Sequence, residues 1–214
     1  MEMKKNVFAL ALCAVLSLSL LSACGGKESA TIKVGASPTP HAQILEVAKE
    51  ILAKDNITLE IVPYDDYVLP NTNVEDGQLD ANYFQHITYM NNFNTNDGTH
   101  LVSVADLHYE PFGIYAGKSA SLDALPDGAQ IAIPDDPTNG GRALLLLQEQ
   151  GLIKLKDGVG LEPTVEDIAE NPHDYKIKQL TANLLTTTLQ DVDVAVINGN
   201  YAIGAGLKAS EALA

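Results

Sequence analysis

Apolar side chains recur along this chain with two different periods, and segments with one period alternate with segments with the other from residue 31 onward. Ile57, Leu59 and Ile61 alternate with polar residues, which is typical of a strand. Residues 44–52 instead place apolar side chains three and four positions apart, which is typical of an amphipathic helix. Strands and helices that alternate in this way predict an α/β fold with mainly parallel sheets.

The same patterns give approximate positions for the elements. We expect strands at residues 32–34, 57–61, 101–105, 113–116, 130–133, 176–180 and 192–197. We expect helices at residues 40–52, 84–93, 140–150 and 164–170. Pro40 suits the first turn of the first helix. That helix is expected to bury Ile44, Leu45, Ala48, Ile51 and Leu52.

The length suits two lobes, at residues 31–112 and 113–198, with a ligand cleft between them and residues 199–214 beginning a return to the first lobe. A single domain is the weaker alternative, because a chain of this size can also form one sheet. Ligands of such folds bind beyond the carboxyl ends of the strands. Polar, glycine-containing segments occur at those ends, at residues 35–40, 64–71, 134–141 and 198–200.

Composition narrows the class of protein. The chain has 214 residues, of which 46% are hydrophobic and 19% charged, and this is ordinary for a globular protein with a buried core. Its formal net charge of −15 repels phosphate backbones. Nucleic acid is therefore not an expected partner.

The N-terminus carries the pattern of a lipoprotein signal. Lys4 and Lys5 precede an apolar run at residues 7–21, and the run ends in the motif Leu-Ser-Ala-Cys at residues 21–24. The run is shorter than the roughly 20 residues that span a bilayer, which disfavours the alternative of a stop-transfer helix. The pattern predicts a signal peptide at residues 1–23 and lipidation of Cys24.

Lipidation places the protein at the cell membrane, on its extracytoplasmic face. A diacylglyceryl thioether, with or without an N-acyl chain, provides the two or three chains that stable anchoring needs. Residues 24–30 then form a short tether. Cys13 lies in the segment that is removed, so no disulfide is expected in the mature chain.

Residues 133–142 contain the sharpest candidate for a binding site, a strand end that passes through a Pro/Gly turn into an apolar helix. Asn139 is a candidate N-cap for this helix. Arg142 lies in the first turn, where a cation opposes the helix dipole unless an anion is bound, and its guanidinium is a fork for a carboxylate. The alternative is a solvated arginine after an ordinary loop.

Aromatic residues form a second candidate. Phe84, His86 and Tyr89 can cluster near a helix start and, with Tyr67, could wall an apolar pocket that suits a thioether. On spacing alone, a core cluster is an equally good interpretation. Asn198 follows an apolar strand and could accept from a ligand ammonium through its amide oxygen, although such an asparagine is more often a turn residue.

Signals of catalysis are poor. The sequence has no Gly-x-Ser-x-Gly motif, and Gly204-Ala205-Gly206 lacks the third glycine of a dinucleotide fingerprint. The histidines, at positions 41, 86, 100, 108 and 173, lack metal-ligand spacing, although zinc receptors can gather histidines from distant loops. We therefore expect neither an enzyme nor a cofactor or metal.

On these residues the chain resembles the NlpA lipoprotein family, the methionine-binding lipoproteins of ABC importers. The resemblance covers residues 31 to about 207. It rests on motifs at residues 66–71, 79–86, 136–142, 152–158 and 195–198. It implies a two-lobed type II periplasmic-binding-protein fold that closes on methionine and docks on an ABC permease with its ATPase.

The resemblance also assigns roles to the candidate residues. It implies that Arg142 holds the carboxylate of the ligand and that Asn198 helps to hold its ammonium. Tyr67, Phe84, His86 and Tyr89 are implied to surround the ligand side chain. Relatives bind L-methionine, D-methionine or a short methionine-containing peptide, so the family leaves this preference open.

Two departures from the family pattern affect the expectations. Leu185-Thr186 stands where the family usually has Pro-Arg, and the chain ends at Ala214, about fifty residues early by that pattern. We therefore expect the first lobe to have uncovered apolar faces. We also expect marginal stability and weak or absent methionine binding, and we expect the C-terminal segment of the family to restore stability and binding. A truncated surface lipoprotein without transport activity is the alternative function.

Overall fold

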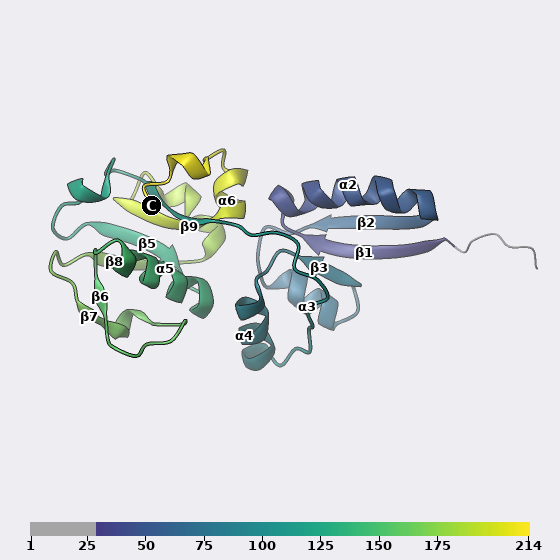
Figure 1. Cartoon of the computed structure of the whole chain (residues 1–214), viewed down its shortest axis with the longest axis horizontal. Coiled ribbons are helices and arrows are strands. Elements are labelled where there is room, and N and C mark those ends of the chain that lie inside the picture. Colours follow the sequence, from purple (N-terminus) through teal and green to yellow (C-terminus); the bar gives the residue numbers. More distant parts are fainter. Residues whose placement is uncertain (1–28) are drawn as a thin grey trace, which may run out of the picture.

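The computed structural model describes residues 29–214, which form two lobes joined by one extended segment (Figure 1). The expected signal peptide, Cys24 and most of the tether lie outside the described residues. Within the described part of the chain, every helix is too short or too polar to cross a bilayer.

The first lobe is built on a three-stranded sheet whose order is β2-β1-β3. Its strands are β1 (Ala30–Ala36), β2 (Ile57–Pro63) and β3 (Ala81–Tyr83). Its helices are α2 (Gln43–Leu52), α3 (Leu69–Glu75) and α4 (Ile87–Asp97). Both neighbours pair with β1 in parallel, so the three strands end at the same edge of the sheet. The sequence did not predict α3 or β3.

Helix α2 departs from the burial that its periodicity predicted. Ile44 is 41% exposed and Ile51 is 56% exposed, whereas Leu45 and Leu52 are half-buried. The helix contacts a small sheet along one side only, so part of its apolar stripe faces solvent. The burial expected for Ile44 and Ile51 was wrong, and the effect of this exposure on stability stays a prediction.

The second lobe has a four-stranded sheet with the order β4-β9-β5-β8. Its strands are β4 (Phe112–Ala116), β5 (Gln130–Pro134), β8 (Lys176–Leu180) and β9 (Val194–Asn198). Helices α5 (Pro137–Glu149) and α6 (Gly199–Gly204) follow β5 and β9 directly. Only β4 runs antiparallel in this sheet, and it pairs with β9.

Aliphatic side chains on both faces of this sheet are fully buried. The sheet and the elements packed on it therefore form the main hydrophobic core. Ile114 and Val196 pack together on one face with Leu144 of α5, while Ile197 packs on the other face. Strands that are covered on both sides read as continuous apolar runs. This explains why the sequence located β5 and β9 well.

Residues 164–170 form a single 3₁₀ turn, Val165–Asp167, followed by strand β7 (Ile168–Glu170). The expected helix there was wrong. The Asp167 carboxylate accepts hydrogen bonds from the backbone N–H and the hydroxyl of Thr164, both at 3.0 Å, and this closes one turn without extending it. Strand β7 then pairs with β6 (Lys154–Leu155), a contact that local periodicity does not contain.

Residues 99–111 connect the lobes without regular secondary structure, so the strand expected at residues 101–105 was also wrong. Val102 is 76% exposed and Val104 is 89% exposed, because no neighbouring strand pairs with this segment. Its alternating pattern is that of a strand, but a strand needs a partner for its backbone groups.

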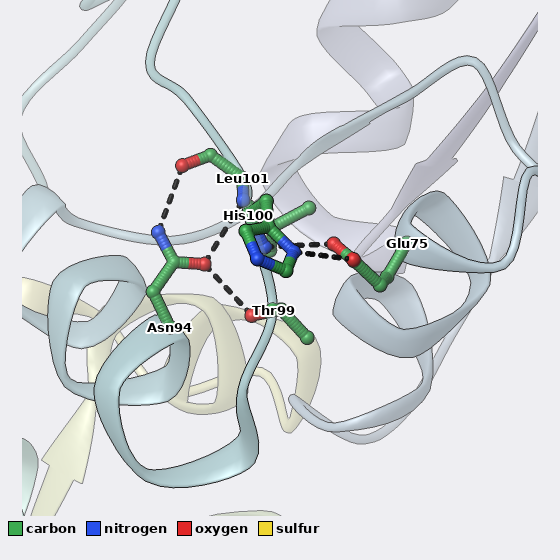
Figure 2. Close-up of polar contacts among 5 residues, drawn as sticks. All are labelled: Glu75, Asn94, Thr99, His100 and Leu101. Carbon is green, nitrogen blue, oxygen red and sulfur yellow. Dashed lines mark hydrogen bonds and ion pairs between the residues drawn. The ribbon is translucent and has the colours of Figure 1, made fainter.

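Side chains of the first lobe anchor the start of this segment (Figure 2). Asn94 accepts from the hydroxyl of Thr99 at 2.7 Å and exchanges two hydrogen bonds with the backbone of Leu101. Glu75 accepts from the backbone N–H of His100 at 2.7 Å, and its other oxygen lies 2.8 Å from Nδ1 of the same residue. The connection therefore leaves the first lobe from a defined point.

Candidate ligand-binding site

A cavity of about 650 Å³ lies between the lobes and is lined by residues of both. Its walls include the carboxyl-terminal ends of the strands, where the sequence placed the binding site. The six predicted ligand-binding side chains all line it: Tyr67, Phe84, His86, Tyr89, Arg142 and Asn198. The structure thus brings together residues from four separate stretches of the chain.

Helix α5 carries the polar end of the cavity. Asp136 is its N-cap, and the Asp136 carboxylate accepts from the backbone N–H of Asn139 at 2.9 Å and from the hydroxyl of Thr138 at 3.0 Å. Pro137 occupies the first helical position, where a missing N–H costs nothing. The expectation that Asn139 caps the helix was wrong, because the helix begins two residues before it.

Two glycines let the first turn of α5 approach neighbouring backbone. A Cβ at Gly140 would lie 2.9 Å from the carbonyl oxygen of Pro134, and one at Gly141 would lie 2.7 Å from Cα of Glu162. A side chain at Gly140 would push the helix start away from the end of β5, and one at Gly141 would push it away from the backbone at Glu162. The glycines therefore help to place the next residue, Arg142, at the cavity.

Asn139 is the centre of the polar network, a role that sequence reasoning missed. Its Oδ1 accepts from Arg142 Nη1 at 3.0 Å and from Asn198 Nδ2 at 3.0 Å, and it lies 3.3 Å from His86 Nε2. His86 Nδ1 accepts from the backbone N–H of Tyr89, so the proton of the neutral ring is on Nε2. Three donors from three elements converge on one buried oxygen.

Arg142 has spare hydrogen-bonding capacity. Asn139 accepts one of its five N–H groups, and the guanidinium carbon lies 4.6 Å from the centre of the Phe112 ring. Among the described residues, no carboxylate forms an ion pair with it. Burial lowers the pKa of Arg142, but an arginine remains charged at pH 7. A partly buried cation without an ion-pair partner suits a ligand carboxylate.

Asn198 is arranged as a complementary acceptor. Its Nδ2 donates to Oδ1 of Asn139, and this hydrogen bond orients the amide so that its own Oδ1 points away from Asn139. That oxygen is buried and has no hydrogen-bond partner in the described structure. A buried carbonyl oxygen left unpaired costs about 1–3 kcal/mol. A ligand ammonium would supply the missing donor.

Aromatic rings form the opposite wall. Tyr67 stacks on Phe84 with ring centres 5.5 Å apart and meets Tyr89 edge-on at 5.8 Å. The hydroxyl of Tyr89 donates to the backbone carbonyl of Tyr67 at 3.2 Å. Burial raises the pKa of both phenols, so they remain neutral. The wall therefore presents apolar ring surfaces, and its only polar atoms are phenol hydroxyls that already donate hydrogen bonds.

Two further residues contact Tyr67 and were not predicted, and of these Asn200 also lines the cavity. Tyr201 packs against Tyr67 with ring centres 5.1 Å apart, and Asn200 accepts from the Tyr67 hydroxyl at 2.6 Å. Both lie on α6, directly after Asn198. Their position just after the end of a buried strand could have marked them as candidate site residues. The sequence pattern does not show that α6 faces Tyr67.

The lobes are in contact across the cavity. Besides the Tyr67–Asn200 and His86–Asn139 contacts, the hydroxyl of Tyr201 donates to the carbonyl of Asp65 at 2.8 Å. Helix α6 also packs against the turn at Pro38–Ala42 in the first lobe. These contacts give the arrangement of a closed two-lobed cleft.

Comparison with known proteins identifies the family. A model of the NlpA lipoprotein family matches residues 32–214. The chain belongs to the NlpA lipoprotein family. The predicted family membership is thereby confirmed. Another member of similar sequence is the D-methionine-binding lipoprotein MetQ of Escherichia coli K12, which is 46% identical over 213 residues, covering 97% of this chain and 78% of that protein.

Solved structures of similar proteins agree. A lipoprotein from Ruminococcus gnavus is 54% identical with a TM-score of 0.85, covering 86% of this chain and 76% of that one. A nutrient-binding protein from Burkholderia cenocepacia, solved bound to methionine, is 44% identical with a TM-score of 0.82 and covers 86% and 78%. The predicted two-lobed α/β fold of this NlpA lipoprotein family member is confirmed.

Proposed function

We propose that this chain is a substrate-binding lipoprotein that captures methionine for an ABC importer. The observation that carries the proposal is the pairing of two unsatisfied groups in one cavity. Arg142 is a partly buried cation without an ion-pair partner among the described residues, and Asn198 Oδ1 is a buried acceptor without a donor. An α-amino acid supplies both missing partners from adjacent atoms.

The aromatic wall selects the side chain of that amino acid. Tyr67, Phe84 and Tyr89 present ring faces and edges to the cavity, with His86 at their border. Sulfur–aromatic contacts contribute about 0.3–1.5 kcal/mol each, so a flexible thioether gains more here than a plain alkyl chain. The names of the relatives, which include methionine-binding proteins, support the same ligand.

Transport requires partners beyond this chain. In the proposal, the methionine-loaded lobes dock on a membrane permease whose ATPase drives import, and the lipid on Cys24 keeps the protein near it. The relatives include the substrate-binding protein of a methionine transporter from Streptococcus pneumoniae, which supports this assignment. Both enantiomers of methionine, and a short methionine-containing peptide, are candidate ligands.

Calorimetry with a series of methionine analogues tests the ligand assignment. We expect L-methionine to bind at one site and norleucine, which replaces the sulfur by methylene, to bind about 2- to 10-fold more weakly. The amine 3-(methylthio)propylamine lacks the carboxylate and should lose on the order of 2–5 kcal/mol. Equal affinity for methionine and this amine would contradict the assignment, and D-methionine measures the enantiomer preference.

The lipid anchor gives a separate prediction. We expect the mature chain to begin at diacylglyceryl-modified Cys24 and to partition into the detergent phase, because two or more acyl chains hold a protein at a bilayer. Cys24→Ser should leave the chain unprocessed and without a lipid, whereas Cys13→Ser should change nothing, because Cys13 lies in the expected signal. Mass spectrometry that finds an unmodified mature N-terminus elsewhere refutes the anchor.

A further inference from the structure

Three side chains near the junction of the lobes gather around one point. His41 follows β1 in the turn at Pro38–Ala42, whereas His108 and Glu110 lie in the connecting segment. The Nε2 atoms of His41 and His108 lie 3.4 Å and 2.8 Å from the same oxygen, Oε1 of Glu110. The three ligand atoms all lie within 4.8 Å of one another.

We propose that His41, His108 and Glu110 form a binding site for a divalent transition-metal ion, with Zn²⁺ as the best match. Two imidazoles and one carboxylate are a common ligand set for zinc, with water in the fourth position. The spacing of the residues does not indicate this site, because position 41 lies far from positions 108 and 110. The three side chains line the same cavity as the methionine site, but none of them is among its predicted ligand-binding residues.

Two of the three separations between ligand atoms lie close to those of a metal centre, and the third is no more than 4.8 Å. Tetrahedral zinc with bonds of about 2.0–2.1 Å places neighbouring donor atoms about 3.3 Å apart. The separation of 3.4 Å between His41 and Glu110 already matches this value. The 2.8 Å between His108 and Glu110 must widen by about half an ångström. Their side chains, which are 25% and 21% exposed, have room to move.

The surroundings favour metal ligation. His108 Nδ1 contacts the hydroxyl of Tyr83, the kind of outer partner that orients a ligating histidine. His41 is only 3% exposed, and its Nε2 faces Glu110.

The position of the site suggests what the metal would do. Glu110 packs on the start of α6 in the second lobe, where a Cβ at Gly199 would lie 3.5 Å from Glu110 Oε2. An ion held by His41 and Glu110 would fasten the first lobe to the connecting segment beside that contact. Zinc should therefore raise the melting temperature as well as bind.

The test uses the full chain in detergent, without a histidine tag and freed of metal by a chelator. We expect calorimetry to show one equivalent of Zn²⁺ bound, and Co²⁺ to give the visible absorption bands of a tetrahedral ion. His108→Ala and Glu110→Gln change partly exposed residues and should each weaken Zn²⁺ binding by at least about tenfold. His41→Gln removes the buried ligand, with circular dichroism to check the fold.

His173→Ala is the matched control, because His173 also pairs with a carboxylate, that of Asp127 at 2.8 Å, but lies on the exposed surface of the second lobe. It should leave Zn²⁺ affinity unchanged. The proposal is overturned if the parent shows no saturable site, or if His173→Ala weakens binding as much as His108→Ala does. Thiolate-to-cobalt charge-transfer bands would also overturn it, by assigning the ion to the cysteines.

Discussion

Arg142→Ala should reduce methionine binding by on the order of 2–5 kcal/mol, which is roughly 30-fold to several thousand-fold in the dissociation constant. The guanidinium is partly buried and lacks an ion pair with any described carboxylate, so it is free to hold the carboxylate of the ligand. Without it, that carboxylate would be buried with no counterion. Isothermal calorimetry of the parent and the variant measures the difference directly.

Arg142→Lys separates charge from geometry. Lysine keeps the cation but not the planar fork, so its affinity should fall between those of the parent and the alanine variant. Lys118→Ala is the control for removal of a positive charge, because Lys118 donates to the backbone of Asp191 on the exposed surface. An affinity of Arg142→Ala within about threefold of the parent, under ~1 kcal/mol, would refute the assigned role.

Asn139→Ala should lower both stability and methionine affinity. Asn139 is only 1% exposed, and its amide oxygen accepts from Arg142 and Asn198. Removing that oxygen leaves buried donors unpaired, at about 1–3 kcal/mol each, although such costs do not add fully. We expect a loss on the order of 2–4 kcal/mol in the free energy of unfolding, measured by urea denaturation.

The affinity should fall for a related reason. Once Asn139 is absent, the side chains of Arg142 and Asn198 can rotate, and the ligand must then order them on binding. We expect calorimetry to show a dissociation constant at least about tenfold higher, because fixing a flexible side chain costs about 0.5–1.5 kcal/mol.

Asn92→Ala is the matched control for an asparagine. Asn92 also forms a hydrogen bond between the lobes, donating to Glu162 at 3.1 Å, but both groups are exposed. Water replaces an exposed partner, so the change should alter the free energy of unfolding by less than about 0.5 kcal/mol. Equal effects of the two substitutions would show that Asn139 is not the organising residue of the site.

The candidate site residues chosen from the sequence line one cavity, whereas some of the predicted elements are misplaced. Arg142 was singled out because it was expected in the first turn of a helix, where a cation opposes the helix dipole. That placement was wrong, because α5 begins at Pro137 and Arg142 lies in its second turn. The resemblance to the family then connected it with Asn198 and with the aromatic residues. The role of Asn139 was missed, because a polar residue at a helix start is most simply interpreted as a cap.

The two wrong predictions of secondary structure share one cause. Residues 164–170 have a helical pattern but form a turn and an edge strand, because β6 offers a partner. Residues 101–105 have a strand pattern but pair with nothing among the described strands. Hydrogen bonds between distant segments determined both outcomes, and local periodicity contains no information about such pairing.

The sequence by itself determined the alternation of strands and helices, the buried strands of the second lobe and the chemical types gathered at the strand ends. These follow from periodicity and from the chemistry of single side chains, which are local properties. The tertiary structure alone decided that three donors meet on Asn139 Oδ1, that Tyr201 packs on Tyr67, and that His41 faces Glu110. Such contacts depend on how the two lobes and the segment between them pack, because only packing brings residues distant in sequence within hydrogen-bonding distance.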